Sequence, residues 1–145
     1  MMREIISILH DEGHALVLFN GSVHTYDERG VSTLYRLLQE NAPLLKGALV
    51  ADKVVGKAAA ALMVLGGVRE VYADVISQLA LDLLGKTEVE VSYGKVVPHI
   101  VNRLGTDWCP METRCVDCQT PEECLVEIEK FIKDMAKGHQ PTAAN

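Results

Sequence analysis

The chain has 145 residues, and 48% of them are hydrophobic, which suffices for one domain with its own core. A net charge of -6 and a pI near 5.3 argue against nucleic acid or an anionic membrane as the main partner. The apolar runs stop short of the roughly 18 residues of a membrane span, and Asp11 and Glu12 come too early for a signal peptide. We therefore expect a cytoplasmic protein with one domain over residues 1–137 and a disordered tail over residues 138–145.

The first third of the chain predicts a helix, a hairpin and a second helix. Residues 3–12 carry apolar side chains at helical spacing. Residues 15–26 hold two short apolar runs around Asn20-Gly21, the strongest short-range signal for a tight hairpin turn. Residues 31–40 have one apolar stripe and one polar face, as expected for a helix that covers one face of a sheet.

The middle of the chain predicts two strand-helix units. An apolar strand over residues 48–52 precedes residues 58–65, which hold no polar side chain and begin with four alanines. Alanine favours helix and is a poor strand former, so this segment predicts a helix buried at the centre of the domain. Residues 68–76 then read as a buried strand and residues 77–84 as a helix. Two such units imply parallel strands with both helix starts at one sheet edge.

The last third predicts an edge strand and two helices. Residues 88–93 alternate between valine and polar side chains, which indicates a strand with one solvated face. Pro98 can open a short helix that ends at Arg103. Thr120 and Glu123 form a capping box in front of a long helix. Its predicted apolar face consists of Cys124, Leu125, Ile128, Phe131, Ile132 and Met135.

Polar residues gather where the first predicted strand gives way to the central helix: Asp52, Lys53, Gly56 and Lys57. A helix start favours negative charge, because its first N–H groups have no intrahelical partner. Ser77 opens the next helix, and ligands of open sheets bind at the carboxyl ends of the strands. We therefore expect a pocket for a small anionic molecule, in which the lysines neutralise its charge. The alternative is structural, with Asp52 and Ser77 acting as caps and the lysines solvated.

The loop before Pro110 also holds reactive groups. Thr106, Asp107 and Cys109 are predicted to close the pocket, beside the single tryptophan, Trp108. A nearby lysine would lower the pKa of Cys109 and make its thiol nucleophilic. Lys57 and Cys109 are thus the candidates for a catalytic role.

The four cysteines follow a C-x5-C-x2-C-x5-C spacing. Only Cys115 and Cys118 have the paired form that recurs in metal and redox sites, so they are candidates for a labile thiol pair or a metal clip. Cys124 falls on the apolar face of the last helix, which favours an inert core thiol.

The order of these elements, a hairpin, a covering helix and two strand-helix units, resembles the cytidine deaminase-like fold. The stretches VVGKAAAALMVLGG and GTDWCPME also resemble a family of uncharacterised bacterial proteins, domain of unknown function 1893, that is assigned to this superfamily. The resemblance spans residues 9–112. It implies a three-layer α/β/α domain with a mixed sheet of about five strands.

Active deaminases of this superfamily hold zinc and a catalytic glutamate with a His-Ala-Glu triplet and a Pro-Cys-x-x-Cys motif at two buried helix starts. The matching positions here are Lys57-Ala58-Ala59 and residues 77–80, which offer neither. The resemblance thus implies a protein that is not a zinc-dependent deaminase and has no cofactor. Metal-free members, a formyl-transferring enzyme of purine synthesis and a sulfur-transferring accessory protein of formate dehydrogenase, imply a pocket for nucleotide-like ligands or sulfur.

Three functions therefore stay open. The first is a metal-free protein that binds a small anionic or nucleotide-like ligand at two helix starts, with or without a reaction. The second is a redox, metal or sulfur-relay protein that works through its cysteines. The third is an interaction module without chemistry, in which the edge strand over residues 88–93 pairs with a second copy to form a homodimer.

Overall fold

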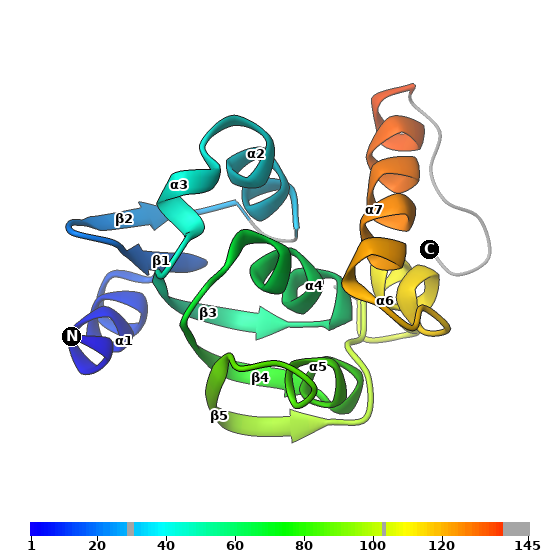
Figure 1. The fold of residues 1–145 in the computed structure, drawn as a ribbon. Helices are drawn as coiled ribbons and strands as arrows, with labels where there is room; N and C mark the ends of the chain where they lie inside the picture. Colours follow the sequence, from blue (N-terminus) through cyan, green and yellow to red (C-terminus); the bar gives the residue numbers. More distant parts are fainter. Residues whose placement is uncertain (29–30, 103, 138–145) are drawn as a thin grey trace.

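The computed structural model describes residues 1–28, 31–102 and 104–137. Its centre is a five-stranded mixed sheet in the order β2-β1-β3-β4-β5 (Figure 1). β3, β4 and β5 are parallel, and β1 is antiparallel to both β2 and β3. The α/β class and the mixed sheet of five strands are confirmed. The strands are β1 (Leu16–Phe19), β2 (Val23–Tyr26), β3 (Leu49–Val55), β4 (Glu70–Ser77) and β5 (Glu90–Val97).

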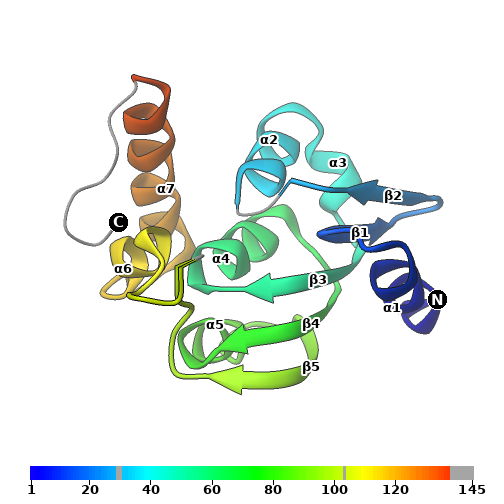
Figure 2. The same cartoon turned by 180° about the vertical axis from the view of Figure 1, so that it is seen from behind.

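The N-terminal helix and hairpin follow the sequence prediction. The hairpin turns at Gly21, whose φ of 81° is a left-handed conformation that glycine adopts at low cost. Helix α1 (Met2–Glu12) lies on one face of β1 and β3, as the view from behind shows (Figure 2). Its Ile5 and Leu9 pack there against Val17.

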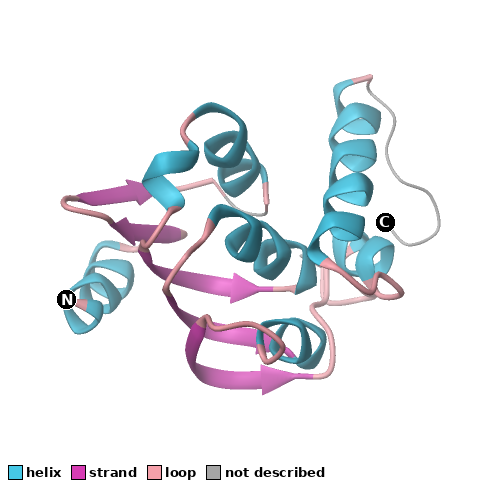
Figure 3. Ribbon diagram, viewed as in Figure 1, coloured by secondary structure: helices cyan, strands magenta, loops and turns pink. Residues whose placement is uncertain are grey.

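The opposite face of the sheet carries the main core. Helices α4 (Lys57–Gly66) and α5 (Gln78–Leu84) lie side by side on it, next to α2 (Ser32–Glu40) (Figures 1 and 3). All but two residues of α4 are buried, which confirms the prediction of a central buried helix. The helix ends at Gly67, whose φ is 81°.

A short helix, α3 (Ala42–Leu45), was not expected from the sequence. It brings Leu45 against the end of α4, where a Cβ atom on Gly66 would come within 2.7 Å of Leu45 Cδ1. Gly66 is therefore required by close packing between α3 and α4 rather than by its backbone angles.

The C-terminal part differs most from the prediction. The expected helix from Pro98 to Arg103 is wrong as far as the structure describes it: residues 98–102 form a bend and a bridge between Val101 and Trp108. Residue 103 lies outside the described residues. The short helix here is instead α6 (Pro110–Cys115), and the long helix α7 (Pro121–Ala136) packs on α4 and α6 (Figure 1).

Three further expectations concern edges and ends. β5 is an edge strand, as predicted, although it extends to Val97. The tail expected over residues 138–145 lies outside the described part of the chain. Within that described part, each helix is too short or too polar to cross a membrane.

Candidate functional site

The start of α4 is closed by a carboxylate from far along the chain. Glu112 on α6 is only 2% exposed. Its Oε1 accepts a hydrogen bond from the backbone N–H of Lys57 at 2.7 Å, and its Oε2 accepts one from the backbone N–H of Ile100 at 2.9 Å. The negative charge that a helix start favours is therefore provided by the protein itself.

The Lys57 side chain points away from the expected pocket. Its Nζ donates hydrogen bonds to the carbonyl oxygens of Val116 at 3.2 Å and Cys118 at 2.6 Å, and the residue is 8% exposed. These bonds fix the turn between α6 and α7 to the central helix. Lys57 thus holds the protein chain at this position, where the sequence predicted contact with an anion.

The start of α5 shows the structural alternative for Ser77. The Ser77 hydroxyl is fully buried and accepts a hydrogen bond from the backbone N–H of Ala80 at 3.1 Å. Because Val55 pairs with Ile76, α4 and α5 do begin at one sheet edge, as the parallel units predict. Ser77 acts as a cap there, and neither Ser77 nor Lys57 lines either of the two cavities described below.

Asp52 does not cap α4, contrary to one of the two readings of the sequence. β3 continues through Asp52 to Val55, because its parallel pairing with β4 extends to that point, and the N-cap residue of α4 is Gly56. Asp52 is partly buried inside the strand. Burial raises the pKa of Asp52 to about 7, against the lowering effect of hydrogen bonds from the Val54 and Lys53 backbone. This carboxyl can therefore exchange a proton near neutral pH.

Asp52 and Lys53 line a cavity of about 470 Å³, which we call the strand-end cavity. Two further carboxylates, Asp27 and Glu28, border it, so that the acidic groups outnumber the one lysine among the residues that the structure describes. The Thr33 hydroxyl, on a residue that is 2% exposed, has no hydrogen-bond partner among the described residues. The remaining lining residues are Gly13, Ala15, Leu16, Leu34 and Val54.

A second and larger cavity, of about 540 Å³, lies beside the start of α4, and we call it the helix-start cavity. Its polar groups are the carboxylate of Glu112, the thiol of Cys109 and the amide of Asn102, and Gly56 borders it as predicted. Neither Lys57 nor Ser77 lines it. The rest of the lining is apolar: Val31, Val54, Ala58, Ala59, Ile100, Val101, Leu104, Pro110, Met111, Phe131 and Met135.

The loop before α6 places its three candidates differently. Cys109 lines the helix-start cavity, but Thr106 and Asp107 are exposed and lie outside its lining. Asn102 accepts a hydrogen bond from the Thr106 backbone at 3.0 Å, so Thr106 stabilises the loop. The ring of Trp108 stacks on His99 at 4.1 Å between ring centres. This loop therefore forms a wall of the cavity and does not close over the two helix starts.

Three cysteines form a cluster behind Lys57. The Sγ atoms of Cys115, Cys118 and Cys124 all lie within 4.8 Å of one another. A hydrogen bond from the Cys115 thiol, with help from Cys118 and the Lys57 ammonium, lowers the pKa of Cys124 to about 7. Burial raises the pKa of Cys118 to about 11. Cys124 is buried as expected, but it belongs to the cysteine cluster and is not an isolated core thiol.

Sequence reasoning missed Glu112 and the place of Cys124. No local signal marks Glu112, because its partner amide is 55 residues away in the chain. The sequence places Cys124 in the core because it lies on the apolar face of the last helix. That position is correct, but it does not reveal that Cys115 and Cys118 pack against it. A signal for the cluster was present in the C-x2-C-x5-C spacing, but only its first pair was recognised.

Fold and site together define a mixed α/β domain whose central helix begins at an internal carboxylate and borders an apolar cavity. Residues 4–132 match the model of the TM1506 family, a domain of unknown function (DUF1893). The chain belongs to this family.

A solved structure supports the same assignment. The chain is similar to a DUF1893 family protein (TM1506) from Thermotoga maritima, determined as a crystal structure at 2.70 Å resolution. The two share 28% sequence identity and a TM-score of 0.82 over 90% of this chain and 89% of the other. A search of curated proteins found no match.

Proposed function

We propose that the chain binds a small uncharged molecule in the helix-start cavity, with an apolar body and at least one N–H group. The observation that carries this proposal is an apolar cavity of about 540 Å³ with the buried carboxylate of Glu112 at its wall. Small-molecule sites are typically apolar cavities of this size with a few polar groups that fix orientation.

The carboxylate selects the ligand. Each Glu112 oxygen accepts one backbone hydrogen bond, and a carboxylate oxygen has room for a second donor. An N–H group of a ligand, such as the amine of a heterocycle, would take that place. Among the described lining residues, a phosphate or carboxylate would face the Glu112 carboxylate and would find no lysine.

The contacts at the start of α4 disfavour the anionic ligand that the sequence predicts. Glu112 occupies the donors at the start of α4, and Lys57 is bound to backbone carbonyls. The described lining of the strand-end cavity, which excludes residues 29 and 30, has one lysine against three carboxylates. A base-like ligand is therefore favoured over a phosphorylated one in both cavities.

The cytidine deaminase-like assignment is also part of the proposal. The observed hairpin, covering helix and two strand-helix units support it. Val31, at the start of α2, lines the helix-start cavity, and Thr33 of α2 lines the strand-end cavity. Val54 of β3 lines both. The helix-start cavity is otherwise lined from the start of α4, from α6, α7 and the loop before α6, and no described residue of α5 lines it. Zinc-dependent deamination stays unexpected, because Lys57-Ala58-Ala59 at this helix start offers no zinc ligand.

The test is a binding screen with uncharged heterocyclic amines, inorganic phosphate and nucleoside monophosphates, read by thermal shift and ligand-observed NMR. We expect some amines to raise the melting temperature and phosphate to leave it unchanged. Ala59→Met would fill the helix-start cavity and abolish binding. Val64→Met, on the same helix but outside the cavity lining, is the matched control and would retain it.

Two results would contradict the proposal. One is a panel in which no amine binds wild-type protein. The other is equal binding to the Ala59→Met variant, which would place the ligand elsewhere. If phosphate alone raises the melting temperature of the protein, an anionic ligand is favoured again. The homodimer through β5 stays a separate prediction, and light scattering that shows only monomer would count against it.

A further inference from the structure

The three thiols of the cysteine cluster come together although no disulfide joins them. Cys115 ends α6, Cys118 lies in the following turn and Cys124 lies in the first turn of α7. Their Sγ atoms are within 4.8 Å of one another. Sulfur atoms around a tetrahedral zinc ion lie about 3.8 Å apart, given a zinc–sulfur distance of about 2.3 Å. Shifts on the order of 1 Å would bring this cluster to that geometry.

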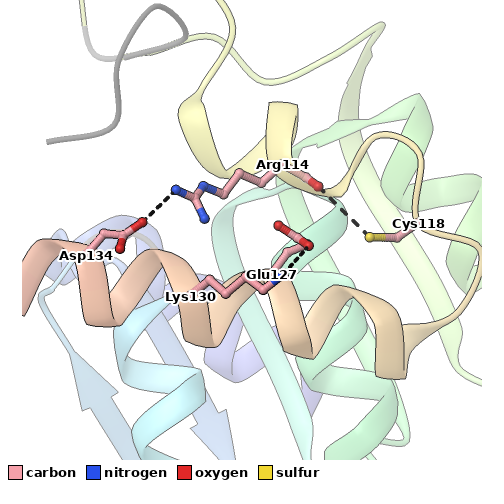
Figure 4. Close-up of polar contacts among 5 residues, drawn as sticks. All are labelled: Arg114, Cys118, Glu127, Lys130 and Asp134. Atoms are coloured by element: carbon pink, nitrogen blue, oxygen red, sulfur yellow. Dashed lines mark hydrogen bonds and ion pairs between the residues drawn. The ribbon is translucent and has the colours of Figure 1, made fainter.

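The backbone around the cluster is held on both sides. The backbone N–H of Cys118 donates to the Cys115 carbonyl at 3.0 Å, which closes the turn between them. The Cys118 thiol points back to the carbonyl of Arg114, and the Arg114 guanidinium pairs with Asp134 of α7 at 2.9 Å (Figure 4). A fixed loop lowers the entropy cost of binding an ion, because its ligands are already gathered.

We propose that Cys115, Cys118 and Cys124 bind one zinc ion or another thiophilic divalent cation. Thiolates are the preferred ligands of such ions, and C-x2-C turns recur in their sites. Three mutually adjacent thiols suit an ion better than a disulfide, which would join two and leave the third unpaired.

The charge of the surroundings fits this assignment. Three thiolates and one divalent ion leave a net charge of -1, and the buried Lys57 ammonium lies beside the cluster to balance it. The first turn of α7 adds the positive end of a helix next to Cys124, and the Glu122 and Glu123 carboxylates of the same turn oppose it in part. In this proposal the Lys57 ammonium neutralises the net negative charge of the metal–thiolate cluster and not that of an external anion.

Cys118 is the most accessible of the three clustered cysteines. Cys115 and Cys124 are 0% exposed, whereas Cys118 is half-buried and gives the ion its route from solvent. Three protein ligands leave a fourth position for water or for a small thiol. This site is separate from the helix-start cavity, whose lining includes Cys109 but none of the three clustered cysteines.

The test is metal binding by the full chain, purified with a phosphine reductant and without chelator. We expect one zinc per chain by elemental analysis after zinc addition and dialysis. Cobalt in place of zinc should give a sulfur-to-metal charge-transfer band and the visible bands of a tetrahedral site. Cys118→Ser, at the half-buried position, should weaken zinc binding at least tenfold and remove the charge-transfer intensity of one thiolate. Cys109→Ser, the matched control, should bind metal as wild type does.

The result that would overturn the proposal is a reduced, folded wild-type protein that takes up no zinc and shows no cobalt band. Equal zinc affinity in wild type and Cys118→Ser would also overturn it. If either buried variant, Cys115→Ser or Cys124→Ser, fails to fold, Cys118→Ser still decides the matter. Because cavity binding is read with Ala59→Met and metal binding with Cys118→Ser, the two proposals fail independently.

Discussion

Removal of the Glu112 carboxylate should uncouple the start of α4 from the C-terminal part of the chain. Two hydrogen bonds, of 2.7 and 2.9 Å, join this buried carboxylate to the backbone of Lys57 and Ile100. A hydrogen bond to a charged group contributes roughly 1.5–3 kcal/mol, and a buried donor left unpaired costs about 1–3 kcal/mol. Two such bonds give about 3–6 kcal/mol, and we expect Glu112→Ala to lower the free energy of unfolding by this amount.

Glu112→Gln separates charge from shape. The amide keeps one oxygen that can accept one of the two bonds, but its NH₂ group then faces the other backbone N–H. We expect a smaller loss, of about 1–3 kcal/mol. Both values come from urea unfolding followed by circular dichroism, together with faster hydrogen exchange of the Lys57 amide. Glu88→Ala, an exposed glutamate, is the control and should change stability by at most about 0.5 kcal/mol.

If Glu112→Ala and Glu112→Gln both stay within about 0.5 kcal/mol of wild type, the Glu112 carboxylate does not couple the start of α4 to the C-terminal part of the chain. Such a result would mean that water satisfies the two amides and that the start of α4 is open to solvent. An external anion could then bind there, and the argument for an uncharged ligand would lose its basis. If Glu112→Ala does not fold, Glu112→Gln and the exchange rate of the Lys57 amide still test the reasoning.

Two other changes test the fold and the strand-end cavity. Gly66→Ala should cost about 1–3 kcal/mol although alanine favours helix, since its Cβ would meet Leu45 Cδ1 at 2.7 Å and Leu45 Cβ at 2.9 Å. Urea unfolding measures the loss. In a Leu45→Ala background the same change should cost less, because only the contact with the Cβ atom remains. Because burial raises the pKa of Asp52 from 3.8 to about 7, the folded state binds its proton more tightly. The stability that this tighter proton binding contributes is complete below about pH 4 and is lost as the pH rises through 7. At about 1.4 kcal/mol per pKa unit, the largest possible effect on the free energy of unfolding is roughly 4 kcal/mol, and partial solvent access reduces it. The free energy of unfolding of Asp52→Asn should therefore exceed that of wild type by about 1–3 kcal/mol at pH 8 but not at pH 4. An equal difference between variant and wild type at both pH values would refute this prediction.

Local signals explain why much of the fold could be predicted. Asn20-Gly21 fixes the hairpin, because the turn needs a left-handed residue at Gly21. The run of alanines from Ala58 fixes the central helix, since propensity and burial agree there. Parallel pairing then follows from two strand-helix units in succession, as the register of Val55 with Ile76 shows.

The site could not be predicted to the same extent, because long-range contacts decide it. Both readings of the region around Asp52 depended on where β3 ends, and pairing with β4 extends the strand past the expected boundary. The direction of the Lys57 side chain depends on carbonyl groups about 60 residues away. The six-residue helix that bears Glu112 is too short for a periodic pattern.

The hydrogen bonds of Glu112 and of the Lys57 side chain have a common origin in the segment that follows β5. α6 brings Glu112 to the first amide of α4, and the turn after it brings two carbonyl oxygens to the Lys57 side chain. Both groups that could have served an external anion are thus bound by the same segment of the chain. The segment leaves an apolar cavity on the side of α4 that faces Glu112 and a cluster of thiols on the side that faces Lys57. The start of the central helix therefore supports two different chemistries, an uncharged ligand at the cavity and a soft cation at the cluster, and anion binding is the one that its own contacts disfavour.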